Sequence, residues 1–288
     1  MNTQSSPQNQ FRSAFVRTFN KLKRIREATI FATIIVFSAL ISIFAPNFFS
    51  INNFRTTAIG MSSDGIIAIG MTVALVSGGF DLSVGSIMGA SSVIAGGLYL
   101  AGVNIWLGCL ISVVICLMLG FFNGVLIGKV GINGFIVTLG MMQMARGIAY
   151  VVTTGSPQSL SSVPAAFGFL GKGNVAGIPF IVLVFIVLAI IGDLLMRNSS
   201  PFRKVFYIGS NQKAASLSGV NVSRIKIGVY LLTSLLSSIA GILTLSRFGV
   251  ATPTAGQGTE MRVISAAVIG GASLNGGEGT ILGAVLGI

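Results

Sequence analysis

Four acidic side chains stand inside or at the edge of long apolar runs, where ionisable groups are costly. They are Asp64, Asp81, Glu260 and Glu278. Of the remaining acidic residues, Glu27 lies in a basic flank, and Asp193 precedes Arg197 by four positions, which predicts an ion pair on a helix surface. Ionisable groups in apolar runs usually face a cavity, pair with a partner or line a path. Each of the four is therefore either half of an interior ion pair, with Arg146 and Arg262 as candidate partners, or a substrate contact.

Asp81 has the most specific surroundings, in the stretch "SGGFDLSVGS" (77–86). Gly78 and Gly79 can adopt backbone angles that end a helix. Asp81 is a good N-cap for the next helix, with its side chain accepting from the backbone N–H of Ser83 or Val84. A helix that breaks inside a membrane leaves polar backbone groups, which are tolerated only beside protein or water. Two interpretations remain open: a half-helix junction that lines a polar cavity, and an ordinary capped turn at the membrane edge.

The same order of residues recurs near the end of the chain. "ALVSGGFDLSVGSIMGA" (74–90) resembles "AAVIGGASLNGGEGTILGA" (266–284), with two extra residues in the second copy. Both segments run from apolar residues through Gly-Gly to a Gly/Ser-rich stretch and then Ile-x-Gly-Ala. We interpret this as an internal repeat. Paired, glycine-interrupted apolar segments are the best sequence pointer to a transport site.

The composition shows which elements must position these residues. Apolar residues make up 53% of the chain, charged residues only 8%, and the mean hydropathy is +0.90, whereas a soluble domain carries about 25% charged residues. The 38 glycines suit closely packed membrane helices. The predicted fold class is all-α: a polytopic transmembrane bundle with about nine to ten spans, some broken or re-entrant, at about 20 residues per span.

The apolar runs place the spans. They lie at about 28–45, 56–77, 83–102, 105–127, 134–152, 178–196, 227–247 and 261–272, with another beginning near 279. Residues 153–177 and 197–226 are expected to be loops. The final run would need roughly ten more residues for a full span, so the chain is expected to be incomplete at its C-terminus. The predicted division is a tail with an amphipathic helix over 1–27 and one membrane domain over 28–288.

The net charge of +12 is concentrated in two segments, 12–26 and 197–226, which hold 12 of the 18 basic residues. This distribution is typical of cytoplasmic loops, so the N-terminus is expected to be cytoplasmic, and nucleic acid is not an expected partner. Residues 11–26 are expected to form an amphipathic helix on the membrane surface, and a plain charged flank is the alternative.

Few residues could perform enzyme chemistry. The chain has no histidine and no phosphate-binding loop motif, so we expect no metal site, no cofactor and no catalytic residue. Cys109 and Cys116 are expected to be small buried apolar residues. The loop stretch "NQKAASLS" (211–218) predicts a short helix that Asn211 caps and Gly219 ends. That helix is either a docking surface or only a compact loop.

Four stretches occur together in the order that is typical of one family: "GGFDLSVGS", "NGFIVTLG", "YIGSNQKAASLSGV" and "GGASLNGGEGTILGA". They are similar to the ribose-type sugar permeases, of the branched-chain/monosaccharide class, in bacterial ABC importers. The resemblance runs from about residue 28 to the end. It implies a multi-pass inner-membrane subunit without bound cofactor, which pairs with an identical or similar permease. A cytoplasmic ATPase would carry ATP and magnesium, and a periplasmic sugar-binding protein would deliver the sugar.

The resemblance also implies roles for particular residues. The matching coupling-helix residues, which would rest in a groove of the ATPase, are Asn211, Ala214, Ala215, Ser218 and Gly219. The residues expected at the translocation pathway or at a helix break are Gly78, Gly79, Asp81, Ser83, Asn133, Thr138, Glu260, Gly270 and Gly271. The expected activity is alternating-access import of ribose or a similar monosaccharide.

Three alternatives stay open: a secondary transporter coupled to ions, an ABC permease for a furanosyl autoinducer, and a membrane subunit without a pathway. The few carboxylates of the chain weaken the first of these. Importers of this general type usually have inverted repeats, whereas the span count makes the two similar segments parallel, so either one span is miscounted or one segment is re-entrant.

Overall fold

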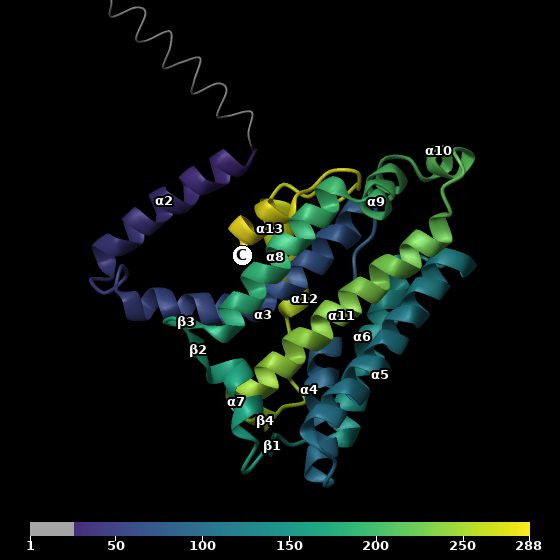
Figure 1. The fold of residues 1–288 in the computed structure, drawn as a ribbon. Helices are drawn as coiled ribbons and strands as arrows, with labels where there is room; N and C mark the ends of the chain where they lie inside the picture. Colours follow the sequence, from purple (N-terminus) through teal and green to yellow (C-terminus); the bar gives the residue numbers. More distant parts are fainter. Residues whose placement is uncertain (1–25) are drawn as a thin grey trace, which may run out of the picture.

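The computed structural model describes residues 26–288, and these form an all-α bundle, as predicted (Figure 1). Its helices are α2 (Arg26–Phe44), α3 (Ile51–Val76), α4 (Val84–Leu100), α5 (Ile105–Val125), the π-helix η1 (Leu126–Val130), α6 (Gly134–Val152), α7 (Ala165–Lys172), α8 (Phe180–Asn198), α9 (Ser200–Ser210), α10 (Gln212–Leu217), α11 (Val222–Phe248), α12 (Thr259–Ile269) and α13 (Ile281–Gly287). The predicted helix over 11–26 lies almost wholly outside the described residues.

Every predicted span coincides with a helix, but the helices differ in length. Among the described residues, the helices long and apolar enough to cross a membrane are those over Ile51–Val76, Ile105–Val130, Gly134–Val152, Phe180–Asn198 and Val222–Phe248, and Ala28–Phe44 and Val84–Leu100 are shorter apolar helices. By contrast, α12 has 11 residues, which corresponds to roughly 16 Å, or about half of a hydrocarbon core. The short helix α12 agrees with the expectation that some spans are broken or re-entrant.

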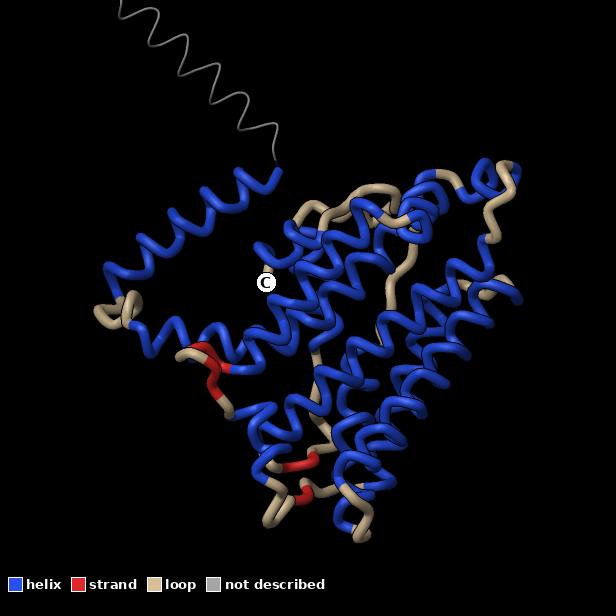
Figure 2. Tube along the Cα trace, in the orientation of Figure 1, coloured by secondary structure: helices blue, strands red, loops and turns tan. Residues whose placement is uncertain are grey.

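The two ends of the bundle differ in their connections. One end, called here the α10 end, carries α9 and α10, and the other carries α7 and the small strands (Figures 1 and 2). The strands β1 (Gln158–Ser159) and β4 (Val250–Ala251) pair antiparallel, as do β2 (Asn174–Val175) and β3 (Ile178–Pro179).

Two segments predicted as loops contain helices. Within 153–177, α7 begins after Pro164 and buries Phe167 completely. Within 197–226, α9 precedes α10. Both helices are shorter than a span, so a search for long apolar runs does not detect them.

Helix α11 is the centre of the bundle and packs on α3, α4 and α5. The contact with α5 is made by glycines four residues apart. A Cβ at Gly120 would lie 2.6 Å from the Tyr230 carbonyl oxygen, and one at Gly124 would lie 2.6 Å from Ile227 Cα. Gly128 of η1 continues the row, because a Cβ there would lie 3.0 Å from the Ser223 carbonyl oxygen. This is the small-residue spacing that lets membrane helices approach closely.

The two similar segments share one local structure. After α3, the N–H groups of Gly78 and Gly79 donate to the carbonyls of Leu75 and Ala74. After α12, the N–H groups of Gly271 and Ala272 donate in the same pattern to Val268 and Ala267. Each is a Schellman motif with a left-handed glycine, Gly78 at φ 79° and Gly271 at φ 96°.

Both segments turn at the α10 end, and they touch each other there. The N–H of Gly277 donates to the carbonyl of Val76 at 2.9 Å. We call residues 77–83 the first glycine break and residues 270–280 the second glycine break. The second follows a half-length helix, which is how two parallel segments fit in one bundle (Figure 1).

Candidate functional site

Asp81 lies in the first glycine break and is completely buried. Its Oδ1 accepts from the backbone N–H of Ser83 at 2.9 Å and from the Ser83 hydroxyl at 2.5 Å. Its Oδ2 accepts from the Thr233 hydroxyl of α11 at 2.6 Å. Asn123 of α5 donates to the Ser83 hydroxyl at 3.1 Å. The carboxylate therefore joins the break to α11, and Ser83 joins it to α5.

The predicted hydrogen bond from Ser83 N–H to Asp81 is confirmed, but the position of the cap differs. Helix α4 begins at Val84, and Ser83 occupies the N-cap position without a side-chain capping bond. Asp81 instead closes the turn before the helix, as short acidic side chains do in Asx turns. With no exposed surface, its carboxylate makes interior contacts in this structure.

Gly78, Gly79 and Asn133 meet at a pocket of about 270 Å³ at the α10 end. Its other polar side chains come from three elements: Ser77 after α3, Gln212 of α10, and Lys226 and Tyr230 of α11. Asn133 also caps α6, because its side chain accepts from the N–H of Phe135 at 2.8 Å. Thr138 does not belong to this group, since it is buried and donates to the Gly134 carbonyl of its own helix.

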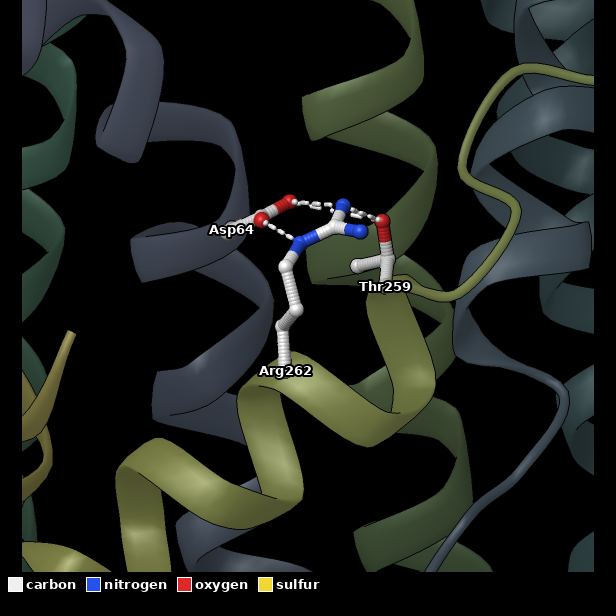
Figure 3. A network of polar contacts seen from close by, with 3 residues as sticks. All are labelled: Asp64, Thr259 and Arg262. Carbon is white, nitrogen blue, oxygen red and sulfur yellow. Dashed lines mark hydrogen bonds and ion pairs between the residues drawn. The ribbon is translucent and has the colours of Figure 1, made fainter.

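A second polar cluster joins α3 to α12 (Figure 3). Arg262 Nε lies 2.6 Å from Asp64 Oδ2, and Arg262 Nη2 donates to the Thr259 hydroxyl at 2.7 Å. Asp64 thus forms a partly exposed ion pair with Arg262, one of its two predicted candidate partners. About half of the Arg262 side chain, 55%, is not covered by protein. The Asp193–Arg197 pair predicted from spacing is also present, at 2.7 Å.

Glu260 lies beside the start of α4, where a Cβ on Gly85 would be 2.6 Å from its Oε2. It interacts electrostatically with Arg146 and Arg262. Arg146 itself donates to the carbonyls of Pro253 and Ala255, at 2.6 and 2.8 Å, and so fixes the loop before α12. Neither arginine pairs with Asp81.

Gly270 and Gly271 lie in the second glycine break, where a Cβ on Gly270 would overlap the backbone of Gly283. The expected pathway residues consequently divide among the Asp81 network, the polar pocket, the Glu260 cluster and the second break, while Thr138 lies apart from all four within α6. Sequence reasoning missed Thr233 and Asn123, because a hydroxyl and an amide among apolar residues carry no signal of what they face.

Helix α10 has the predicted boundaries. Asn211 Oδ1 accepts from the N–H of Ala214 at 3.0 Å, and Gly219 ends the helix at φ 82°. Ala214 and Ser218 are exposed, but Ala215 is only 5% exposed and packs into the protein itself. The residue that sequence reasoning missed is Leu217, whose exposed fraction of 91% is the highest of any large apolar side chain in residues 28–288.

Comparison with known proteins adds to this geometry. Residues 53–287 match the family described as the permease component of branched-chain amino acid transport systems. The chain belongs to this family. It is 36% identical to the ribose import permease protein RbsC of Escherichia coli (strain K12) over 273 residues, which is 94% of this chain and 85% of that protein.

Two further relatives show the range of the family members. The chain is 37% identical to the ribose import permease protein RbsC of Bacillus subtilis (strain 168), over 90% of this chain and 80% of that protein. It is 36% identical to the L-arabinose transport system permease protein AraH of Escherichia coli (strain K12), over 90% and 79%. No solved structure matches. This chain is therefore a multi-pass membrane protein of a family of transport permeases.

Proposed function

We propose that this permease imports ribose or a closely similar monosaccharide as the membrane subunit of an ABC importer. Relatives at 36% and 37% identity are ribose and L-arabinose permeases. The structural observation that carries the proposal is α10, a short capped helix at one end of the bundle with an exposed leucine. Such a helix suits a groove on a cytoplasmic ATPase, which would bind ATP and magnesium on its own chain.

The α10 end is cytoplasmic in this proposal, and so is the N-terminus. The basic loop over 197–226 supports this orientation. A periplasmic binding protein supplies the affinity for the sugar, because a pathway must bind weakly enough to release it. Two copies, or this chain and a similar permease, rock against each other as the ATPase closes and opens.

The test is sugar-dependent ATP hydrolysis in proteoliposomes that hold permease, ATPase and binding protein, assayed across a panel of pentoses and hexoses. The proposal expects stimulation by one sugar and uptake that stops without ATP. Uptake that continues without the ATPase and collapses with an ionophore would support the ion-coupled alternative instead. If a furanosyl autoinducer stimulates ATP hydrolysis and no sugar does, the proposed substrate class is wrong, but the assignment as an ABC importer permease stands.

A further inference from the structure

Three backbone segments cross at the α10 end with no side chain between them. Gly209 of α9 lies against the carbonyl of Val76, the last residue of α3, so closely that a Cβ on Gly209 would overlap the carbonyl oxygen. The same Cβ would approach the backbone nitrogen of Gly277 to 2.6 Å. Gly277 N–H in turn donates to the Val76 carbonyl. One carbonyl thus meets α9 on one side and the second glycine break on the other.

The contact is equally close from the second glycine break. A Cβ on Gly276 would lie 2.8 Å from both the Gly209 carbonyl oxygen and Gly78 Cα. A Cβ on Gly277 would overlap the side chain of Ser210. We call the meeting of Gly78, Gly209, Gly276 and Gly277 the glycine junction.

Gly209 has no local reason to be glycine. It lies in the regular helix α9 and is absent from the residues with positive φ, unlike Gly78, Gly276 and Gly277. Glycine inside a helix costs about 1 kcal/mol relative to alanine. The position therefore needs a residue without a Cβ for the sake of the contact with Val76.

Only Ser210 and Asn211 separate Gly209 of the junction from α10. Asn211 alone separates α9 from α10, and it ends the first helix and caps the second. The Val76 carbonyl immediately precedes the first glycine break, which contains Asp81. Contacts between packed backbones transmit displacement because protein interiors are dense and compress little.

We propose that Gly209 is the positioning residue through which the coupling helix α10 moves both glycine breaks together. This rests on the proposed function, because it takes α10 to be the helix that meets the ATPase. A displacement of α10 is carried by α9 to the Val76 carbonyl, and from there to the first break directly and to the second break through Gly277. The two similar segments, distant in sequence, thereby respond to one input.

The first variant is Gly209→Ala, which inserts a Cβ between α9 and Val76. We expect it to insert and to bind the ATPase normally, because the exposed face of α10 is unchanged. Sugar-stimulated ATP hydrolysis and uptake should fall about fivefold or more, at the lower end of typical coupling between sites, while basal hydrolysis persists. The matched control is Gly228→Ala, a helical glycine in α11 with no atom within 4 Å of its built Cβ, which should stay within about twofold of the parent.

The second variant joins α9 to the second break covalently, by Ser210→Cys with Gly277→Cys in a chain whose Cys109 and Cys116 are alanine. The reduced pair already carries a Cβ at the junction, so its own uptake is measured first and must be clearly above background. If these elements move as one unit, the oxidised pair should then hydrolyse ATP and transport at a rate similar to the reduced pair. If α9 and the second glycine break instead move apart during the cycle, oxidation should block ATP hydrolysis and transport, and reduction should restore both.

Normal stimulation in Gly209→Ala would overturn the proposal, and so would a disulfide that reversibly stops the cycle. If Gly209→Ala fails to assemble, the disulfide pair alone decides. If the parent chain shows no ATP-driven uptake of any sugar, the proposed function is refuted. If the parent transports a sugar and the Gly209→Ala variant transports it equally well, only the coupling role of Gly209 is refuted.

Discussion

Asp81 should be replaceable by asparagine but not by alanine. In the structure its Oδ1 accepts from the N–H and hydroxyl of Ser83, and its Oδ2 accepts from the Thr233 hydroxyl. Thr233 also donates to the carbonyl of Tyr230 at 3.0 Å. Asparagine keeps the oxygen that faces Ser83, and its amide nitrogen can donate to the Thr233 oxygen while the Thr233 hydroxyl donates to Tyr230. All partners therefore remain satisfied without the charge.

Alanine removes every acceptor at once. The N–H and the hydroxyl of Ser83, which is completely buried, lose their acceptor. The hydroxyl has a substitute, since the Oδ1 of Asn123 has no hydrogen-bond partner and can accept from Ser83 after a rotation of its amide. The N–H has none, and a buried unsatisfied donor costs about 1–3 kcal/mol. We expect Asp81→Ala to lose about that much stability, and Asp81→Asn to lose less than about 1 kcal/mol.

The assay is thermal unfolding of the purified permease in detergent, paired with uptake in proteoliposomes. Asp81→Asn should match the parent in melting temperature and uptake, whereas Asp81→Ala should melt several degrees lower. An asparagine variant as unstable as the alanine variant would show that the break needs the charge. A stable asparagine variant without uptake would show that the carboxylate acts on the sugar, which would refute a purely structural role.

Three other substitutions test separate parts of the structure. Leu217→Asp should weaken ATPase binding about tenfold to a hundredfold, since burying a leucine contributes about 1.5–3 kcal/mol, and Leu217→Met should bind normally in the same pull-down. The free energy of unfolding of Asp64→Ala, Arg262→Ala and the double variant should give a coupling energy of about 1 kcal/mol, because the ion pair is partly covered by protein. Strictly additive losses of stability would contradict this. Gly124→Leu should destabilise the permease by about 1–3 kcal/mol through overpacking, whereas Gly140→Leu, with open space around its Cβ, should be tolerated.

The sequence predicts helices well here because membrane spans are long and uniformly apolar. The nine runs each contain a helix, and the caps at Asn211 and Gly219 follow from residue type alone. Short elements escape this reasoning. Helix α9, which buries Val205 and Ile208, reads in the sequence only as part of a basic loop.

Side-chain partners are the part that the sequence could not supply. Spacing predicts Asp193 with Arg197, because i and i+4 face each other on one helix. It gives no preference between Arg146 and Arg262 as the partner of Asp64, since that choice depends on which helices meet. The same holds for Asp81, whose partner Thr233 is 152 residues away.

The two acidic sites differ in burial and in hydrogen-bond donors, which explains why only one of them has a charged partner. Asp64 faces a surface where Arg262 is half uncovered, and a lone carboxylate there would have few hydrogen-bond donors around it. Asp81 has three donors from two elements within 2.9 Å. Hydrogen bonds to a carboxylate are roughly twice as strong as those between neutral groups, so three of them can hold the first glycine break without an arginine.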